Sequence, residues 1–325
     1  MPDIIAIGEA LIDFIPTTPG KGLADTPAFE KRPGGAPANV AVGVSRLNGY
    51  SGFIGKLGRD EFGDFLKQTL YQNGVDTEAL VYTDEAKTAL AFVTLKENGE
   101  REFIFYRSPC ADILLQPEEI KEEYIKRAKV LHFGTVSLID NPSAAATYHT
   151  VKLARQMGKV ISLDVNLREP LWPSLDKAKE EFLNALQLAD IVKVSEEELY
   201  FATCQQEIDA GAEKLLQMGA ELVLVTLGSK GCYIKTTAYS REVPGIKVKP
   251  VDTTGAGDAF TAAVLTKLVE AGISNRENIK GISVEKMEHL CKFANAAGAL
   301  TCTKNGAISA LPTLSEVNKS MKNVK

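Results

Sequence analysis

The segment VDTTGAGDAF, residues 251–260, holds the residue types most suited to chemistry. Gly255 and Gly257 flank one alanine, and Asp258 follows just before an apolar run that is typical of a helix. The first N–H groups of a helix lack helical partners and carry partial positive charge, so glycines there let an anion approach closely. A carboxylate at the same point can take a proton from an attacking hydroxyl. The segment therefore predicts an anion hole beside a general base, which suits phosphoryl transfer.

Three other interpretations of this segment compete with that one. Asp258 can simply cap a helix beside a turn. A dinucleotide fingerprint requires glycine at position 260, where the chain has Phe260. A Walker P-loop requires G-x-x-x-x-G-K-[ST], and the stretch GKLG at Gly55 lacks the hydroxyl residue. From the segment alone, the cap and the anion hole both stay open.

Composition narrows the class of protein. The 325 residues are 45% hydrophobic and 24% charged, with a net charge of −5, which gives no reason to expect nucleic acid or a membrane as the main partner. The start of the sequence shows no signal-peptide pattern, so we expect a cytoplasmic protein. The five cysteines lack CxxC spacing and there are three histidines, which argues against zinc and His-based centres.

The expected elements alternate between strands and helices. Short apolar strands are expected at 3–7, 50–54, 130–133, 160–163, 191–194 and 222–226, and helices at 60–72, 144–156, 175–187, 209–217, 256–270 and 284–300. Repeated strand–helix units predict an α/β protein with a doubly wound, mostly parallel sheet. Ligands bind at the carboxyl ends of such strands, and residues 255–258 lie at such a point.

A hairpin departs from this pattern. Residues 88–95 and 101–106 alternate apolar and polar side chains around KENGE, with Asn98-Gly99 at the turn. Together with residues 11–33 it predicts a small sheet at one edge, where a lid would lie. We expect one domain, 1–325, with lid segments at about 11–33 and 88–108.

Two signatures extend the argument to the whole chain. VDTTGAGDAF resembles the C-terminal signature of the ribokinase-like (PfkB) sugar kinases, and PGGAPANVAVGVSRLN from Pro33 with GFIGKLGRDEFG from Gly52 resembles the N-terminal one. The resemblance runs from GEALIDF at Gly8 to GAISALPT at Gly306. LDVNLREPLW and FIFYRSPCADILL are similar to stretches typical of fructokinases, although 2-keto-3-deoxygluconate kinases share variants of them.

The resemblance implies a doubly wound α/β fold with a β-sheet lid that is often a dimer contact in relatives. It implies transfer of the ATP γ-phosphate to the 6-hydroxyl of fructose, with Mg²⁺ and possibly K⁺. One rival is a kinase for a sugar acid such as 2-keto-3-deoxygluconate, whose carboxylate needs a cation that Arg107 or Arg168 can supply. The other is a catalytically silent sugar- or nucleotide-binding scaffold, which the intact Asp258 argues against.

Residue roles follow from the same resemblance. Asp258 matches the catalytic base and Gly255, Ala256 and Gly257 the anion hole, while Arg168 faces the substrate or the transferring phosphate. The residues that match sugar contacts, or that orient them, are Asp13, Gly34, Gly35, Asn39, Arg107, Asp164 and Asn166. A carboxylate such as Asp13 can accept from two vicinal hydroxyls.

The nucleotide and metal residues come from weaker matches. The residues that match the nucleotide side are Lys193, Ser195, Thr226, Gly228, Gly231 and Asn295. Glu198 in KVSEEE, with Ser195 replacing the family's usual asparagine, is expected to organise Mg²⁺ through water, and an ordinary acidic helix start is the alternative. Asp252 and Thr254 match a monovalent-cation site.

Overall fold

The structure is a computed structural model, and it describes the chain except for residues 19, 96–100, 108 and 324–325. Its centre is a nine-stranded sheet in the order β13-β12-β11-β10-β9-β8-β1-β4-β5. The strands are β1 (Ile4–Ile7), β4 (Ser51–Gly58), β5 (Leu80–Thr83), β8 (Val130–Gly134), β9 (Val160–Asp164), β10 (Ile191–Ser195), β11 (Leu222–Thr226), β12 (Gly231–Lys235) and β13 (Ser240–Pro244). Only β11–β12 and β12–β13 pair antiparallel, so the predicted mostly parallel α/β sheet is confirmed.

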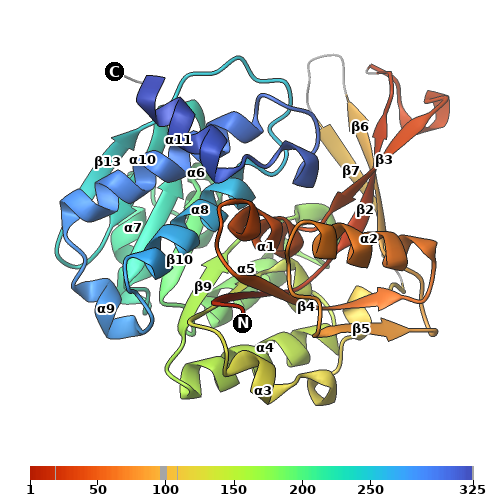
Figure 1. The fold of residues 1–325 in the computed structure, drawn as a ribbon, viewed down its shortest axis with the longest axis horizontal. Helices are drawn as coiled ribbons and strands as arrows, with labels where there is room; N and C mark the ends of the chain where they lie inside the picture. Colours follow the sequence, from red (N-terminus) through yellow and green to blue (C-terminus); the bar gives the residue numbers. More distant parts are fainter. Residues whose placement is uncertain (19, 96–100, 108, 324–325) are drawn as a thin grey trace.

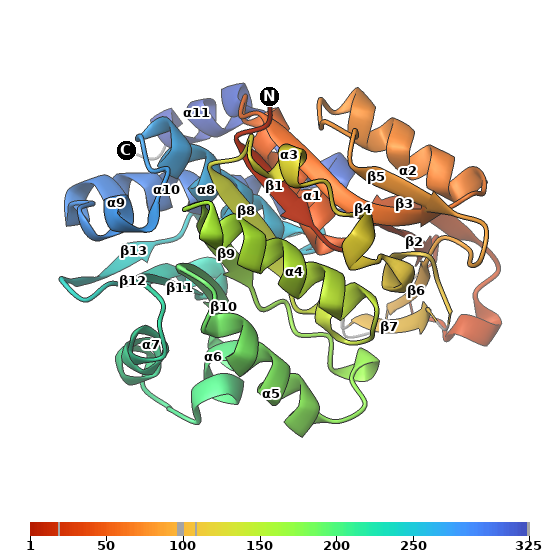
Figure 2. The ribbon, with the colours of Figure 1, turned by 90° about the horizontal axis from the view of Figure 1, so that it is seen from below.

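Helices cover both faces of this sheet (Figures 1 and 2). One face carries α1 (Ala36–Arg46), α8 (Ala256–Glu270), α9 (Arg276–Lys280), α10 (Val284–Thr301) and α11 (Leu314–Asn323). The other carries α3 (Glu122–Ile125), α4 (Ser143–Gln156), α5 (Leu175–Leu186), α6 (Glu196–Thr203) and α7 (Ile208–Gln217). The central strands are buried by both layers, which explains their continuous apolar runs.

The carboxyl ends of the central strands meet along one edge. In the register of the sheet, Gly134 lies opposite Asp164, Asp164 opposite Lys193, and Ser195 opposite Thr226. Since these strands run parallel, polar residues far apart in the chain gather at that edge. The edge therefore collects several of the residues predicted to bind substrate or nucleotide.

A four-stranded sheet of order β3-β2-β6-β7 stands beside the main sheet (Figure 1). Its strands are β2 (Leu11–Pro16), β3 (Phe29–Gly34), β6 (Leu90–Leu95) and β7 (Arg101–Tyr106), and α2 (Glu61–Gln72) packs nearby. β6 and β7 pair antiparallel, as the hairpin prediction requires, while its Asn98-Gly99 turn lies outside the described residues. A small second sheet is thus confirmed, and its lid function remains a prediction.

Three strands at the edges of the main sheet were not predicted, β5 at one edge and β12 and β13 at the other. β12 and β13 form an antiparallel pair, and in β13 only Val243 is buried. An edge strand with solvent-exposed side chains needs no regular apolar pattern, so its sequence carries little signal. Among the described residues, no helix combines the length and the apolar character needed to cross a membrane.

Candidate active site

The N-terminal turn of α8 separates two cavities. The smaller holds about 530 Å³ of space between protein atoms and is lined by Asp13, Gly35, Asn39, Asn166, Arg168, Thr254, Gly255 and Asp258, among others. The larger holds about 1200 Å³ and is lined by Thr226, Gly228, Gly231, Asn295, Ala256 and Gly257, among others. The turn predicted to form the anion hole is therefore the wall between them.

Gly255 is required by its backbone conformation, and Gly257 is closely packed. Gly255 has a φ of 79° and precedes α8, and a Cβ there would lie 3.1 Å from Ala307 Cα. A Cβ on Gly257 would lie 3.1 Å from Lys193 Nζ. No side chain caps α8, so the helix-cap interpretation of Asp258 is wrong. Because no side chain caps the helix, its first N–H groups can face a ligand, although the Ala256 N–H also donates to the Thr253 carbonyl at 3.3 Å.

Asp258 is buried in the first turn of α8, and a side chain of α1 forms a hydrogen bond with its carboxylate. Asn39 Nδ2 donates to Asp258 Oδ2 at 2.7 Å, and both residues line the smaller cavity. Burial, together with the charge of Asp164, raises the pKa of Asp258 to about 6, against the opposing effects of Asn39, Lys193 and Arg168. A carboxylate with this pKa is ionised at neutral pH and basic enough to take a proton.

The glycine pair before α1 closes around Asp13. A Cβ on Gly34 would lie 2.2 Å from Asp13 Oδ2, so only glycine leaves room for that carboxylate. Gly35 has a φ of 104°, and a Cβ there would lie 2.4 Å from the carbonyl oxygen of Glu9. The turn thereby presents Asp13 and backbone to the smaller cavity.

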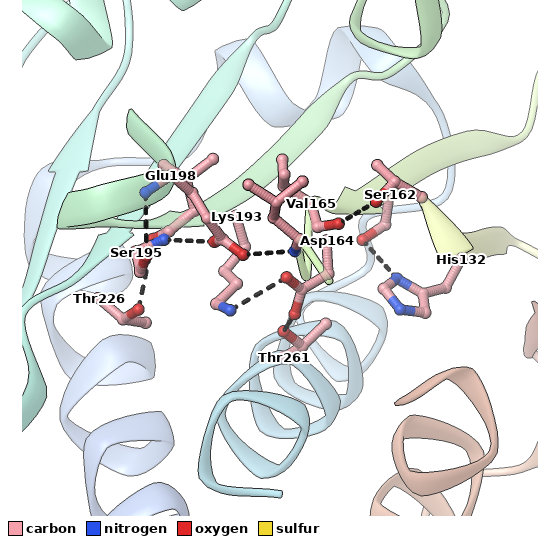
Figure 3. Close-up of polar contacts among 12 residues, drawn as sticks. His132, Ser162, Asp164, Val165, Lys193, Ser195, Glu198, Thr226 and Thr261 are labelled. Atoms are coloured by element: carbon pink, nitrogen blue, oxygen red, sulfur yellow. Dashed lines mark hydrogen bonds and ion pairs between the residues drawn. The ribbon is translucent and has the colours of Figure 1, made fainter. Parts of the chain in front are cut away.

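A buried ion pair between Lys193 and Asp164, drawn in Figure 3, lies close enough to Asp258 to act on its charge. Lys193 Nζ lies 3.0 Å from Asp164 Oδ1, and Thr261 Oγ1 donates to Asp164 Oδ2 at 3.1 Å. Both Asp164 oxygens are thus engaged within the protein, and Asp164 does not line either cavity described above. Although burial favours the neutral amine, the carboxylates of Asp164 and Glu198 outweigh it and raise the pKa of Lys193. The ammonium stays charged beside the α8 turn.

Glu198 braces two backbone segments (Figure 3). Its carboxylate accepts from the Ser195 N–H at 2.7 Å and from the Leu167 N–H at 2.8 Å, and Ser195 Oγ accepts from the Glu198 N–H at 3.1 Å. The two reciprocal bonds between Ser195 and Glu198 form the capping box of α6, and the Leu167 contact ties it to the loop after β9. The acidic helix start foreseen as the alternative is therefore present, and the remaining lone pairs can still contact water. In the described part of the chain, no three His, Cys, Asp or Glu side chains cluster as a metal site.

The two arginines predicted to face substrate lie differently. Arg168 lines the smaller cavity together with Asn166, which adopts a φ of 43° in the loop after β9. Arg107 is not among the lining residues; it is buried and forms an ion pair with Asp112. The structure brings Arg168, but not Arg107, to the cavity wall.

The remaining predicted residues fall beside the α8 turn. Asn295 Nδ2 donates to the carbonyls of Val243 and Pro244, both at 3.1 Å, which fixes α10 against β13. Asp252 accepts from the N–H groups of Thr254 at 2.7 Å and Gly306 at 2.9 Å. The structure thereby joins the loop before α8 to the loop at Gly306, and a cation site at Asp252 and Thr254 stays a prediction.

Sequence reasoning missed three residues near the site. Glu9 lines the smaller cavity and its Oε1 accepts from the Ala36 N–H at 3.0 Å. Burial raises the pKa of Glu9 to about 7, partly opposed by Arg107. Thr261 lies one turn after Asp258 on α8, a helical spacing that could have flagged it, and Asp112 pairs with Arg107. For Glu9 the available signal was its place just after β1.

Similarity to known proteins identifies the family of this chain. Residues 1–314 match the pfkB family of carbohydrate kinases. The chain belongs to this family. The kinase is 49% identical to fructokinase-1 of Oryza sativa subsp. japonica over 98% of this chain and 97% of the relative.

Solved structures agree with the sequence relatives. The kinase is similar to a Xylella fastidiosa fructokinase with bound ATP, with a TM-score of 0.90, 37% identity and 99% of each chain covered. It is also similar to a Vibrio cholerae O395 fructokinase with bound fructose, ADP and calcium ion, with a TM-score of 0.86, 38% identity and 98% of each chain covered. The predicted family and the ribokinase-like fold are confirmed.

Proposed function

We propose that the kinase is an ATP-dependent fructokinase that converts D-fructose and ATP to fructose 6-phosphate and ADP. The observation that carries this function is the α8 turn, which places Asp258 in the smaller cavity and Ala256 and Gly257 in the larger one. Fructose suits the smaller cavity and ATP the larger. The full-length similarity to fructokinases supports the choice of sugar.

The reaction follows from this placement. Asp258 takes the proton of the fructose 6-hydroxyl as that oxygen attacks the γ-phosphorus, and the bond from the γ-phosphorus to the bridging oxygen breaks to release ADP. The N–H groups of the Gly255–Gly257 turn stabilise charge on the transferring group. Lys193 lies beside Gly257, and Arg168 faces the same point from the sugar side. Asn39 holds the base in position.

We assign binding roles on the same grounds. Asp13, Gly35 and Asn166 contact fructose, Gly34 makes room for Asp13, and Asp164 acts through Lys193. Thr226, Gly228, Gly231 and Asn295 contact the nucleotide, with Ser195 at the adjoining strand end. Mg²⁺ is the metal we propose to accompany ATP, held through water by Glu198, since Mg²⁺ usually keeps several waters. Asp252 and Thr254 with nearby carbonyls suit K⁺.

We also propose a homodimer through the lid and a cytoplasmic location. Phe92 packs against Phe14, Phe29 and Tyr106 with ring centroids 4.9–5.4 Å apart, and Ile104 and Tyr106 on the outer strand β7 are exposed. Apolar side chains on an outer strand suit a second copy of the lid. Sedimentation of the purified chain as a monomer at micromolar concentration contradicts the dimer.

A substrate panel tests the function. Coupled ADP release is measured with MgATP, in K⁺ and in Na⁺, against fructose, glucose, ribose, 2-keto-3-deoxygluconate and adenosine. We expect fructose to lead in kcat/KM by about tenfold or more, which corresponds to about 1.4 kcal/mol of transition-state preference. A lead by another sugar contradicts the fructose assignment, and the absence of any reaction favours the silent scaffold.

The pH profile follows from the base. Because Asp258 acts only when ionised, we expect kcat/KM for fructose to fall as the pH drops through about 6, the pKa of this buried carboxyl. Asp164→Asn removes a negative charge that raises that pKa, so the acid limb should move to lower pH. Steady-state rates from pH 5 to 8 measure the acid limb of the unaltered kinase and that of Asp164→Asn. An acid limb that Asp164→Asn leaves unmoved counts against this source of the pKa shift.

A further inference from the structure

Arg107, a cation that could pair with the carboxylate of a sugar acid, is already paired with a carboxylate of the protein. Arg107 follows β7 directly and is buried, with only 8% of its surface exposed. One of its terminal nitrogens forms an ion pair with Asp112 Oδ2, and Asp112 starts a 3₁₀ turn at Asp112–Leu114. The Arg107 charge is therefore paired from inside the protein, although its Nε is buried without a hydrogen-bond partner among the described residues.

Asp112 is itself held at both oxygens. Cys110 Sγ donates to Asp112 Oδ1 at 2.7 Å, while Oδ2 accepts from Arg107. Cys110 belongs to a small apolar cluster with Leu11, Ala89 and Ala91 under the lid strands. The carboxylate is buried and fixed, so it holds the guanidinium in one place.

Acidic side chains outnumber basic ones on the cavity wall. Three of its lining side chains are carboxylates, Glu9, Asp13 and Asp258, against one arginine, Arg168. Glu9 Oε2 is buried and has no hydrogen-bond partner among the described residues, and its charge also acts on Arg107. A carboxylate taken out of water needs a paired cation, and nearby carboxylates repel it. Neutral polyols meet no such penalty, since their hydroxyls donate to carboxylates.

We propose that Asp112 determines substrate specificity: by holding Arg107 in an internal ion pair, it denies a sugar acid a second cationic partner beside Arg168 and leaves a cavity that selects neutral sugars. The inference rests on the proposed fructokinase function and identifies what separates it from a sugar-acid kinase. Asp112 acts through Arg107 and is a positioning residue. Exclusion of this kind works by leaving the wrong ligand's charge unpaired.

Asp112→Asn tests the proposal with nearly unchanged shape. The measured quantities are kcat and KM for fructose and for 2-keto-3-deoxygluconate with MgATP. We expect the ratio of kcat/KM for fructose to that for the acid to fall by about tenfold or more, mainly through a lower KM for the acid, because a freed Arg107 can pair with its carboxylate. Asp112→Ala, which removes the acceptor altogether, should give a larger change in the same direction.

A double variant separates this effect from a general loosening of the site. In Asp112→Asn/Arg107→Met, the gain toward the acid should disappear, because the cation that mediates it is gone. A gain that persists in the double variant, or an unchanged ratio in both Asp112 variants, overturns the proposal.

A measurement on the unaltered kinase does not depend on the folding of any variant. We expect 2-keto-3-deoxygluconate to inhibit the fructose reaction with an inhibition constant about 100-fold or more above the KM for fructose. An inhibition constant equal to that KM overturns the proposal. Turnover of the acid in preference to fructose would instead contradict the proposed function itself.

Discussion

Asp258→Asn is expected to lower kcat by about two to four orders of magnitude while fructose and ATP still bind. The amide has nearly the same shape and can still accept from Asn39, but it cannot take the proton of the sugar hydroxyl. Steady-state kinetics give the turnover, and calorimetric titration with fructose and with a non-hydrolysable ATP analogue gives the two affinities.

Asp176→Asn is a matched control for this variant. Asp176 lies in the first turn of α5, as Asp258 does in α8, but it is exposed and lines neither cavity. The control should keep normal turnover. Near-normal turnover in Asp258→Asn would rule out Asp258 as the base, and loss of both affinities would show that the residue supports structure instead.

Lys193→Met is expected to lower kcat by about two orders of magnitude, because it removes a buried positive charge beside the anion hole. The change also leaves the buried Asp164 carboxylate with the Thr261 hydroxyl as its one side-chain partner among the described residues, which costs stability. Turnover with fructose and MgATP is measured together with the thermal unfolding temperature. The loss should appear in kcat more than in the KM for fructose, since Lys193 does not line the sugar cavity.

The double variant Lys193→Met/Asp164→Asn distinguishes the two effects. It removes both charges, so the unfolding temperature should recover much of its loss, while turnover stays low. Recovery of turnover in the double variant would contradict a role for Lys193 in catalysis and would leave it only the task of neutralising Asp164.

The regular part of the fold could be predicted because burial leaves a signal in the sequence. β8 to β11 are covered on both faces and read as short apolar runs, and the helices between them carry one apolar face. At the edge, β13 buries only Val243, so the apolar pattern is absent there. β12 is buried, but its apolar run, residues 232–234, is too short to stand out in the sequence.

The part of the site formed by neighbouring residues of one helix start could be predicted from the sequence. Gly255, Gly257 and Asp258 adjoin in sequence, so their joint role follows from the start of one helix. The contact of Asn39 with Asp258 joins residues 219 positions apart, and that of Asp164 with Thr261 joins residues 97 positions apart. Such pairings depend on how α1, β9 and α8 pack, which local pattern does not encode. For the same reason, the sequence left Arg107 available for a sugar acid, whereas packing pairs it with Asp112.

The most direct test of the central claim is to identify the product. Phosphorus and carbon NMR follow the purified kinase with MgATP and carbon-13-labelled D-fructose. We predict one fructose 6-phosphate for each ADP formed, with loss of the γ-phosphate signal of ATP. Phosphate on another hydroxyl would contradict the placement of O6 beside Asp258, and ADP release without any sugar phosphate would contradict the fructokinase function.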